Sequence, residues 1–454
     1  MPDHHPTDVT AAAPTRRDSP YAWFVVSLLM VTSAVSFVDR QLLNLLIEPI
    51  KHDLHASDTQ LGFLQGAAFI VAYLAFGPFC GRLADKGDRR NLLVAAVVLW
   101  SSATILCGLA VNLPMLFASR AGVGAAEAAL GPAAASLIAD YFTKERLPRA
   151  LSINILGAYV GGGLALVFGG LAVGSARAIS AAVPAFSHLA AWQTAFITVG
   201  APGLFLALLL LVIREPARRS FVVTDDHPTE QVYGLGDAVR FLWASRSFYG
   251  RYMGAMTLLT LVLYAVPAWM PSLMIRTFGM APKQVGLAYG ATTLVMGVLG
   301  ALSGPTLNTL LRRRWPNTSM MLCVALPAFA IAATLPLIAL AKTFPQALAV
   351  AAAVTYFYTL PQAVAVSALL IATPNRMRGI MGGLYVMCAS GIGLGLGPAL
   401  VALVTDKVFG DPHAIVLSLP LVGATAAIGA GLLALGSLPY VAAILTKATP
   451  ATPQ

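Results

Sequence analysis

Charged residues are scarce in this chain. Asp, Glu, Lys and Arg make up 11% of its 454 residues, whereas 58% of the residues are hydrophobic. A soluble globule usually carries about twice that share of charge on its surface. The shortage therefore excludes a soluble globular protein and predicts a polytopic membrane protein. The net charge of +10 would suggest a nucleic-acid partner, but the basic residues follow loop topology, so we expect no nucleic-acid binding.

Cysteine, histidine and catalytic motifs are also lacking. The four cysteines lie in apolar runs without C-x-x-C spacing, which argues against disulfides and zinc and predicts buried free thiols at Cys80, Cys107, Cys323 and Cys388. All seven histidines fall in predicted loops or the N-terminal tail. A membrane-embedded enzyme, the rival class, would need H-E-x-x-H, G-x-S-x-G or a buried histidine. We therefore expect no enzymatic activity, no metal and no cofactor.

Apolar stretches long enough to cross a bilayer alternate with charged, Pro-rich or Gly-rich breaks. They fall near residues 21–47, 59–85, 91–111, 114–142, 147–174, 192–213, 247–275, 283–311, 318–341, 345–373, 377–405 and 413–445. This pattern predicts an all-α membrane protein of twelve transmembrane helices in two pseudo-symmetric six-helix halves. The predicted parts are a disordered cytosolic tail (1–20), a first half (21–213), a cytosolic linker (214–246), a second half (247–445) and a cytosolic tail (446–454).

Basic residues support this topology. Most of the 29 Lys and Arg residues fall on alternate loops, as the positive-inside rule requires when no helix has been missed. The three inside predicted spans are Arg40, Arg120 and Arg251. We therefore expect a multi-pass protein of the bacterial cytoplasmic (inner) membrane, with both termini in the cytosol and membrane lipids around it. We expect it to be monomeric.

A charged loop after the second predicted span is echoed in the second half. Gly81-Arg-Leu-Ala-Asp85, followed by two arginines, has the spacing of Gly304-Pro-Thr-Leu-Asn308, which two arginines also follow. The first copy resembles the signature between helices 2 and 3 of the major facilitator superfamily. It departs from that signature at Asp88, where the superfamily often has Gly. Parallel six-helix halves with the substrate site between them are a known transporter design.

That resemblance implies a gate on the cytosolic side. Asp85 and Arg89 would latch this side against the start of helix 11 near Arg378, while Gly81 would permit close helix approach and Arg90 would face the cytosol. The alternative is a merely solvated charged loop. The copy in the second half should latch more weakly, because it has Asn where the first copy has Asp.

Two charges lie deep in the first predicted span. Asp39 and Arg40 share one helix face with Ser36 and Asn44. Charges at that depth are costly, so membrane proteins usually keep them for ion pathways or substrate sites. The alternative is an ion pair that only fixes packing.

The fourth span carries a matching stripe. Arg120, Gly124 and Glu127 fall on one face of it. The depths of Asp39 and Glu127 differ by roughly 8 Å at the rise of an α-helix, so the side chains of Asp39, Arg40, Arg120 and Glu127 can meet. Asp39 and Glu127 are the only carboxylates well inside a span. Burial raises the pKa of a carboxylate, whereas a nearby arginine lowers it. Moving the arginine could therefore tie proton binding to alternating access.

Four segments together resemble the Spinster family, a branch of the major facilitator superfamily. They are Ser36-Phe-Val-Asp39-Arg40-Gln41, Arg120-Ala-Gly-Val-Gly124-Ala-Ala-Glu127-Ala, Ile138-Ala-Asp140-Tyr-Phe142 and Arg149-Ala-Leu-Ser152-Ile. The likeness covers mainly helices 1–5, and the second half matches only in layout. It implies export of sphingolipid or lysophospholipid species. It also implies proton coupling, with Asp39 and Glu127 as protonation sites and Arg40 as their electrostatic partner.

Aromatic residues in several spans are candidates for lining a cavity that takes an amphipathic ligand. They are Tyr73, Tyr159, Tyr264, Trp269, Tyr356 and Tyr358. Placement at the membrane interface or plain packing is the alternative for each. The glycine runs at Gly161–Gly163 and Gly391–Gly397 lack the strand and lysine of a phosphate loop, so we interpret them as sites of close helix packing.

The leading hypothesis is a proton-coupled secondary active transporter of an amphipathic or lipid-like solute, driven by a proton gradient. The alternative is a proton-coupled carrier of a small organic anion, in which Arg40 and Arg120 would hold a carboxylate. In either case the partners are a small-molecule or lipid substrate and protons.

Overall fold

The fold is that of a computed structural model, which describes residues 18–143, 145–218, 235–373 and 377–448. Most of both predicted tails, and residues 219–234 of the predicted linker, lie outside the described residues. The described chain is helical and contains no strand, which confirms the predicted all-α class.

The first half consists of α1 (Pro20–Leu54), α2 (Asp58–Gln65), α3 (Ala67–Lys86), α4 (Arg89–Gly108), α5 (Leu113–Glu127), α6 (Leu130–Tyr141), α7 (Leu147–Ala182) and α8 (Ala191–Leu210). The second half consists of α9 (Leu235–Ala244), α10 (Arg246–Phe278), α11 (Pro282–Arg314), α12 (Ser319–Thr334), α13 (Phe344–Thr359), α14 (Gln362–Ala372), α15 (Arg378–Leu403) and α16 (Ile415–Ala448). Short 3₁₀ turns (Pro184–Phe186, Leu335–Leu340, Pro412–Ala414) and a π-helical turn (Val404–Phe409) connect them.

Eleven stretches of the described chain are long and apolar enough to cross a membrane. The remaining predicted span is the tenth, 345–373; it forms α13 and α14, of 16 and 11 residues, which break at Leu360-Pro361. The second and fourth spans are broken in the same way, into α2 and α3 and into α5 and α6. The helix α9 was not predicted, because it lies in a stretch that we interpreted only as a linker.

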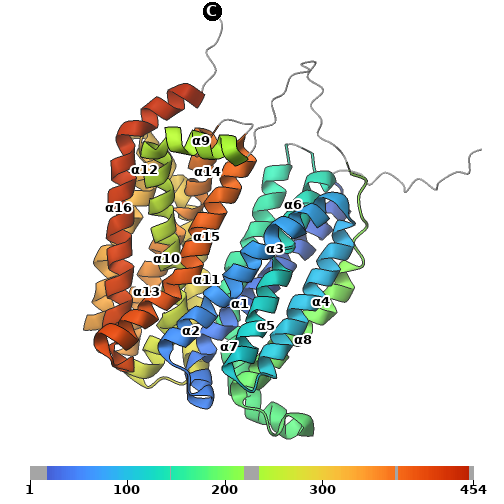
Figure 1. Cartoon of the computed structure of the whole chain (residues 1–454). Helices are drawn as coiled ribbons and strands as arrows, with labels where there is room; N and C mark the ends of the chain where they lie inside the picture. The colour runs from blue at the N-terminus through green and yellow to red at the C-terminus, as the bar shows by residue number, and fades with distance from the viewer. Residues whose placement is uncertain (1–17, 144, 219–234, 374–376, 449–454) are drawn as a thin grey trace, which may run out of the picture.

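The two halves stand side by side, and their ribbons converge toward the lower end of Figure 1. We call the upper end, where α3 and α8 end and α9 lies, the linker side. The opposite end, which carries residues 55–57 between α1 and α2, is the far side. The halves meet where α7 packs on α11, α2 on α15 and α1 on α10.

Glycines allow the closest of these contacts. A Cβ atom added to Gly163 would lie 2.5 Å from the Cβ of Leu294, and one added to Gly170 would lie 3.1 Å from the Cα of Gly286. Helices α7 and α11 therefore approach to backbone contact. In the second glycine run, a Cβ on Gly393 would lie 2.8 Å from the side chain of Thr260. These contacts support the packing interpretation of both runs.

An ion-pair cluster joins the halves at the far side. Arg276 of α10 donates to both carboxylate oxygens of Asp58, each at 2.7 Å, and to Oε1 of Glu48 at 2.9 Å. It also donates to the carbonyl of Pro412 at 2.9 Å, and Lys51 completes the cluster with a 2.6 Å contact to Asp58. The Asp58 side chain is fully buried. Two acids and two bases thus balance each other across the boundary between the halves.

A second polar contact lies next to this cluster. The carboxylate of Asp406, in the π-helical turn of the second half, accepts from both the main-chain N–H and the hydroxyl of Thr59, each at 2.7 Å. Thr59 lies in the first turn of α2, where unpaired N–H groups attract a negative charge. Ion pairs and hydrogen bonds, as well as helix packing, therefore hold the two halves together at the far side.

The linker side lacks such contacts within the described residues. A Cβ atom added to Gly81, Gly382 or Gly383 would meet no atom within 4 Å. Gly81 was predicted to permit close helix approach, and in this arrangement it does not. The halves are therefore apart at the linker side and joined at the far side.

Arg276→Gln should open the far side, because it leaves Asp58 and Glu48 with only Lys51 as a counter-charge. Breaking a buried ion pair costs about 3 kcal/mol. This corresponds to roughly a hundredfold change in the ratio of molecules closed at the far side to molecules open there. Distances between spin labels on the α1–α2 connection and on residues 410–412 should lengthen. Arg240→Gln, which removes an exposed arginine that pairs within α9, is the control. Equal distance distributions in both variants would contradict the locking role.

Candidate functional site

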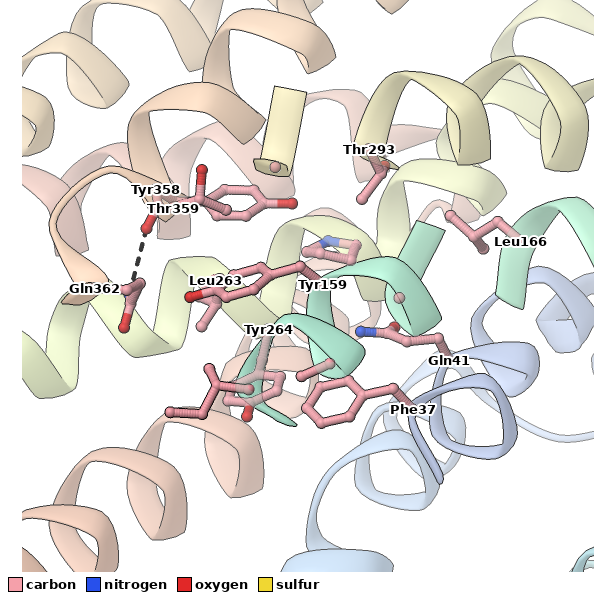
Figure 2. A pocket seen from close by; sticks show the side chains of 15 residues that line it. Phe37, Gln41, Tyr159, Leu166, Leu263, Tyr264, Thr293, Tyr358, Thr359 and Gln362 are labelled. Atoms are coloured by element: carbon pink, nitrogen blue, oxygen red, sulfur yellow. Dashed lines mark hydrogen bonds between the residues drawn. The ribbon is translucent and has the colours of Figure 1, made fainter. Parts of the chain in front are cut away.

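A cavity of about 180 Å³ lies between the halves (Figure 2). One buried water needs roughly 10–15 Å³ on this scale, so the space can hold a ligand and is not a packing defect. Residues of α1, α7, α10, α11, α13 and α14 line it: Phe37, Gln41, Ile155, Ala158, Tyr159, Gly162, Leu166, Leu263, Tyr264, Pro267, Thr293, Gly297, Tyr358, Thr359 and Gln362.

The predicted aromatic residues divide into two groups. Tyr159, Tyr264 and Tyr358 line the cavity. Trp269 does not: it is fully buried, and its indole N–H donates to the carbonyl of Pro398 at 2.8 Å, which fastens α10 to α15. Tyr356 is outside the lining as well, and its ring packs on Phe357 with the centroids 5.5 Å apart. For Trp269 and Tyr356, packing is therefore the observed role.

The other three predicted cavity residues also lie outside this lining. Ser36 donates to Oε2 of Glu127 at 2.8 Å. Asn44 accepts from Gln65 at 3.2 Å. The ring of Tyr73 stacks on Phe69 at 5.7 Å. Each contributes to the surroundings of the buried charges described below.

The lining of the cavity carries no ionised side chain among the described residues. Its polar groups are those of Gln41, Gln362, Thr293 and Thr359, together with the tyrosine hydroxyls (Figure 2). Most of these residues were not predicted, because an uncharged polar side chain in an apolar span costs little and gives no strong pattern. Gln41 could have been predicted as a cavity residue, because it directly follows Asp39-Arg40 in the first span.

Four charged side chains form a buried cluster beside the cavity: Asp39, Arg40, Arg120 and Glu127. We call it the charge cluster. Arg40 and Glu127 form an ion pair between α1 and α5. The Glu127 side chain is 1% exposed and that of Arg40 is 14% exposed. The guanidinium of Arg40 lies over the rings of Phe37 and Phe69, 4.7 and 4.3 Å from their centroids, so aromatic faces cover the rest of its charge.

Arg120 and Asp39 are the inner members of this cluster, and neither forms an ion pair with the described residues. Arg120 donates to the main-chain oxygens of Asp39 at 3.2 Å and of Arg40 at 3.4 Å. The Asp39 carboxylate is fully buried; the hydroxyl of Thr104 lies beside it, but neither carboxylate oxygen accepts a hydrogen bond of ordinary geometry from the described part of the chain. The sequence-based expectation that all four charges could meet agrees with this geometry.

Gly124 sets the spacing of the cluster. A Cβ atom at this position would lie 2.2 Å from the carbonyl oxygen of Phe69, so α5 and α3 touch here through their backbones. This contact places the ring of Phe69 against Arg40. The stripe of Arg120, Gly124 and Glu127 predicted from the sequence is thus a packing surface as well as a charged one.

A small polar recess connects the charge cluster with the boundary between the halves. It has room for about one water, at about 10 Å³, and Arg40, Gln41, Asn44, Gln65 and Tyr264 contribute to its wall. Gln65 donates to the carbonyl of Ala268 in α10 at 2.9 Å as well as to Asn44. Because Gln41 and Tyr264 also line the main cavity, the recess lies between that cavity and Arg40.

The predicted gate residues hold the first half together in this arrangement. Arg89 is fully buried and pairs with Asp140 of α6 and with Glu215, the latter at 2.6 Å. Arg378 donates to the carbonyl of Thr373 at 3.2 Å, within its own half. The predicted latch of Asp85 and Arg89 on the eleventh predicted span, which begins near Arg378 and forms α15, is therefore not formed here, because the halves are apart at the linker side.

Asp88 and Arg90 have local roles. The Asp88 carboxylate accepts from the main-chain N–H of Asn91 at 2.7 Å and caps α4, which explains an acidic residue at this position. The N–H of Arg90 donates to Glu215 at 3.0 Å. Arg218 donates to the carbonyl of Ala84 at 2.8 Å, at the end of α3. The beginning of the predicted linker is thus bound to α3 and α4.

No group of three or more His, Cys, Asp or Glu side chains in the described residues could hold a metal ion. The four cysteines are free; Cys80, Cys107 and Cys323 are buried as predicted, whereas Cys388 is partly exposed.

Comparison with known proteins agrees with the fold. The profile of the Major Facilitator Superfamily matches residues 29–398. The chain is 27% identical over 395 residues to an MFS-type efflux pump of Mycolicibacterium smegmatis, covering 86% of each chain. It is 27% identical over 324 residues to Protein spinster of Drosophila melanogaster, covering 70% of this chain but only 50% of the relative.

Among solved structures, a bacterial homolog of the human lysosomal transporter Spinster, in an inward-facing and unoccupied conformation, has a TM-score of 0.81 at 22% identity. That match covers 96% of this chain and 100% of the other. A D-xylose-proton symporter has a TM-score of 0.65 at 15% identity and covers 89% of this chain and 96% of its own, which shows a shared fold. The chain therefore belongs to the major facilitator superfamily of membrane transporters and is similar to the Spinster branch.

Proposed function

We propose that this protein is a proton-coupled secondary active transporter that moves an amphipathic, lipid-like solute of the lysophospholipid or sphingoid class by alternating access. The observation that carries the proposal is the buried Asp39 carboxylate, which lies beside the Arg40–Glu127 ion pair and forms no ion pair of its own with the described residues. A proton gradient supplies the driving force, without a cofactor.

The balance of charge supports proton coupling. An ionised carboxylate buried without a donor is costly, so a proton on Asp39 relieves the cost of this arrangement. If Arg40 turned from Glu127 to Asp39, then Glu127 would become the carboxylate without a partner. Each position of Arg40 thus favours a proton on a different acid. The small recess beside Arg40, which adjoins the main cavity, gives protons and water a route to the pair.

The cavity supports the amphipathic solute over the organic anion. The alternative needs Arg40 and Arg120 to hold a carboxylate, but Arg40 is paired with Glu127 and Arg120 is directed at main-chain carbonyls. Neither arginine lines the main cavity, and no other cation among the described residues does so. Tyrosine rings and apolar side chains suit an apolar tail.

The proposal also includes the orientation of the protein in the membrane. We propose that the linker side faces the cytosol of a bacterial inner membrane, so the arrangement described here is open to the cytosol. The protein would act as a monomer. When the halves rock the other way, the latch of Asp85 and Arg89 against the start of α15 would form as the far-side ion pairs separate.

Asp39→Asn and Glu127→Gln should each abolish uptake driven by a pH gradient, because the amide mimics the protonated acid and cannot release a proton. Both variants should still exchange substrate across the membrane without a gradient, since their fold is intact. The measurement is transport of a fluorescent lysophosphatidylcholine by proteoliposomes with and without an imposed gradient. Asp411→Asn, which changes an exposed acid that caps its own 3₁₀ turn, is the matched control. Parental gradient-driven rates in both variants would exclude these residues as the coupling site.

Single-chain lipids should compete for the cavity, whereas small hydrophilic anions should not, because the lining carries no cation among the described residues. The measurement is inhibition of lysophosphatidylcholine transport by a sphingoid base, a second lysolipid, and lactate or citrate as the anions. Saturable competition by the anions alone would restore the organic-anion alternative.

Arg40→Ala should destabilise the protein more than either amide variant, because it leaves the Glu127 carboxylate buried without its partner. The expected loss is about 3–5 kcal/mol, measured by chemical unfolding of the purified protein. The double variant Arg40→Met with Glu127→Gln should recover much of that loss, since it removes both charges. A single variant as stable as the parent would show that the ion pair is energetically dispensable.

A further inference from the structure

Three carboxamide side chains form a chain of hydrogen bonds that ends at the central cavity. Gln65 of α2 donates to the carbonyl of Ala268 in α10 at 2.9 Å and to Oδ1 of Asn44 at 3.2 Å. The amide nitrogen of Asn44 donates to Oε1 of Gln41, one turn earlier on α1. Gln65 and Asn44 are buried, whereas Gln41 is partly exposed and lines the cavity. We call these three side chains the amide chain.

The direction of the amide chain is fixed at its buried end. A carbonyl oxygen can only accept, so the atom of Gln65 that meets Ala268 must be the amide nitrogen. The same nitrogen donates to Asn44, which therefore presents its oxygen to Gln65 and its nitrogen to Gln41. Gln41 must then present its oxygen to Asn44. The nitrogen of Gln41 is left as the free end of the chain.

This free nitrogen faces the cavity. Nε2 of Gln41 is accessible and makes no hydrogen bond with the described residues. Figure 2 shows it directed into the space between the halves, with Phe37 and Leu166 on either side of Gln41. A solute that fills the cavity displaces water from this nitrogen, and it must supply an acceptor because a donor left without a partner lowers affinity.

Asn44 and Gln65 position this donor without contacting the solute, because neither lines the cavity. They contribute instead to the wall of the small recess beside it. The anchoring carbonyl of Ala268 belongs to the second half, whereas all three carboxamides belong to the first. The amide chain therefore crosses the boundary between the halves and holds the Gln41 carboxamide in one orientation.

A single amide donor in these surroundings selects an uncharged oxygen. An ionised phosphate or carboxylate would need a counter-charge, and no ionised side chain of the described residues lines the cavity. Phe37 and Leu166, which flank Gln41 in Figure 2, offer no further polar partner. One neutral acceptor with apolar groups beside it is the chemistry of the carbonyl at the head of an acyl chain.

We infer that Nε2 of Gln41 donates to the ester carbonyl of an acylated solute, so the cavity selects acyl lysolipids. A sphingoid base has no such carbonyl and is the poorer ligand. This inference rests on the amphipathic solute of the proposed function and narrows its class. It does not depend on proton coupling.

Two competitors that differ in one group test this subsite: palmitoyl lysophosphatidylcholine and its hexadecyl ether analogue, in which a methylene group replaces the carbonyl. They share the headgroup and the chain length, so they partition into a bilayer alike. Each displaces a fluorescent lysophosphatidylcholine from the full-length protein in nanodiscs, at constant pH and without a proton gradient. The parent should prefer the ester by roughly three- to tenfold, as expected for one net hydrogen bond.

Gln41→Leu should abolish this preference by weakening the ester, with the affinity of the ether unchanged. Because this variant leaves the nitrogen of Asn44 without an acceptor, the double variant Gln41→Leu with Asn44→Leu removes that group too, and it should show the same loss. Gln65→Leu, which keeps Gln41 but removes its anchor, should lower the preference in part. Gln284→Leu, which removes an exposed carboxamide at the start of α11, is the matched control and should keep the full preference.

An ester preference that persists in Gln41→Leu and in the double variant would overturn the subsite, since the carbonyl would then be recognised elsewhere. Equal displacement by the ester and the ether from the parent would overturn it as well, but would leave the amphipathic solute of the proposed function standing. Failure of both lipids to displace the fluorescent ligand from the parent would overturn the amphipathic solute itself, and the subsite with it.

Discussion

The ion pair between Arg40 and Glu127 is the interaction on which the first half depends. It joins α1 to α5 inside a membrane span, where a charge without a partner is costly. The surrounding contacts follow from it: Ser36 donates to the same carboxylate, the ring of Phe69 covers the guanidinium, and Gly124 lets α5 come close enough to α3 for this to happen. Asp39 is the second acid within this arrangement. In the proposed mechanism, the guanidinium of Arg40 would move between the two acids and so give two arrangements of similar charge balance, one for each state of the transporter.

Polar contacts between the halves are distributed unevenly. At the far side Arg276, Asp58 and Glu48 form ion pairs across the boundary, whereas Arg89 pairs with Asp140 and Glu215 inside the first half. Helices α7 and α11 remain in contact through Gly163 and Gly170. The ion pairs that join the halves are therefore concentrated at one end of the molecule.

Much of the fold could be predicted from the sequence, because a bilayer demands long apolar helices and tolerates few buried charges. The same scarcity made Asp39, Arg40, Arg120 and Glu127 conspicuous, and they do lie together. Tyrosines could be proposed for the cavity only as a group, since Tyr159 and Trp269 look alike in a span although one lines the cavity and the other packs on Pro398. Gln65 gave no signal, because an uncharged polar side chain is ordinary in a helix. The pairing of Arg276 with Asp58 could not be predicted either, since charges at helix ends are common and these two lie 218 residues apart.

The attachment of Glu215 and Arg218 to the first half bears on the mechanics of the whole molecule. Glu215 and Arg218 bind α4 and α3, while α9 contacts α10 and α15, so the two ends of the predicted linker are attached to different halves. In a rocking motion of the halves, each end of the linker would therefore move with its own half, and none of the hydrogen bonds that attach these ends would have to break.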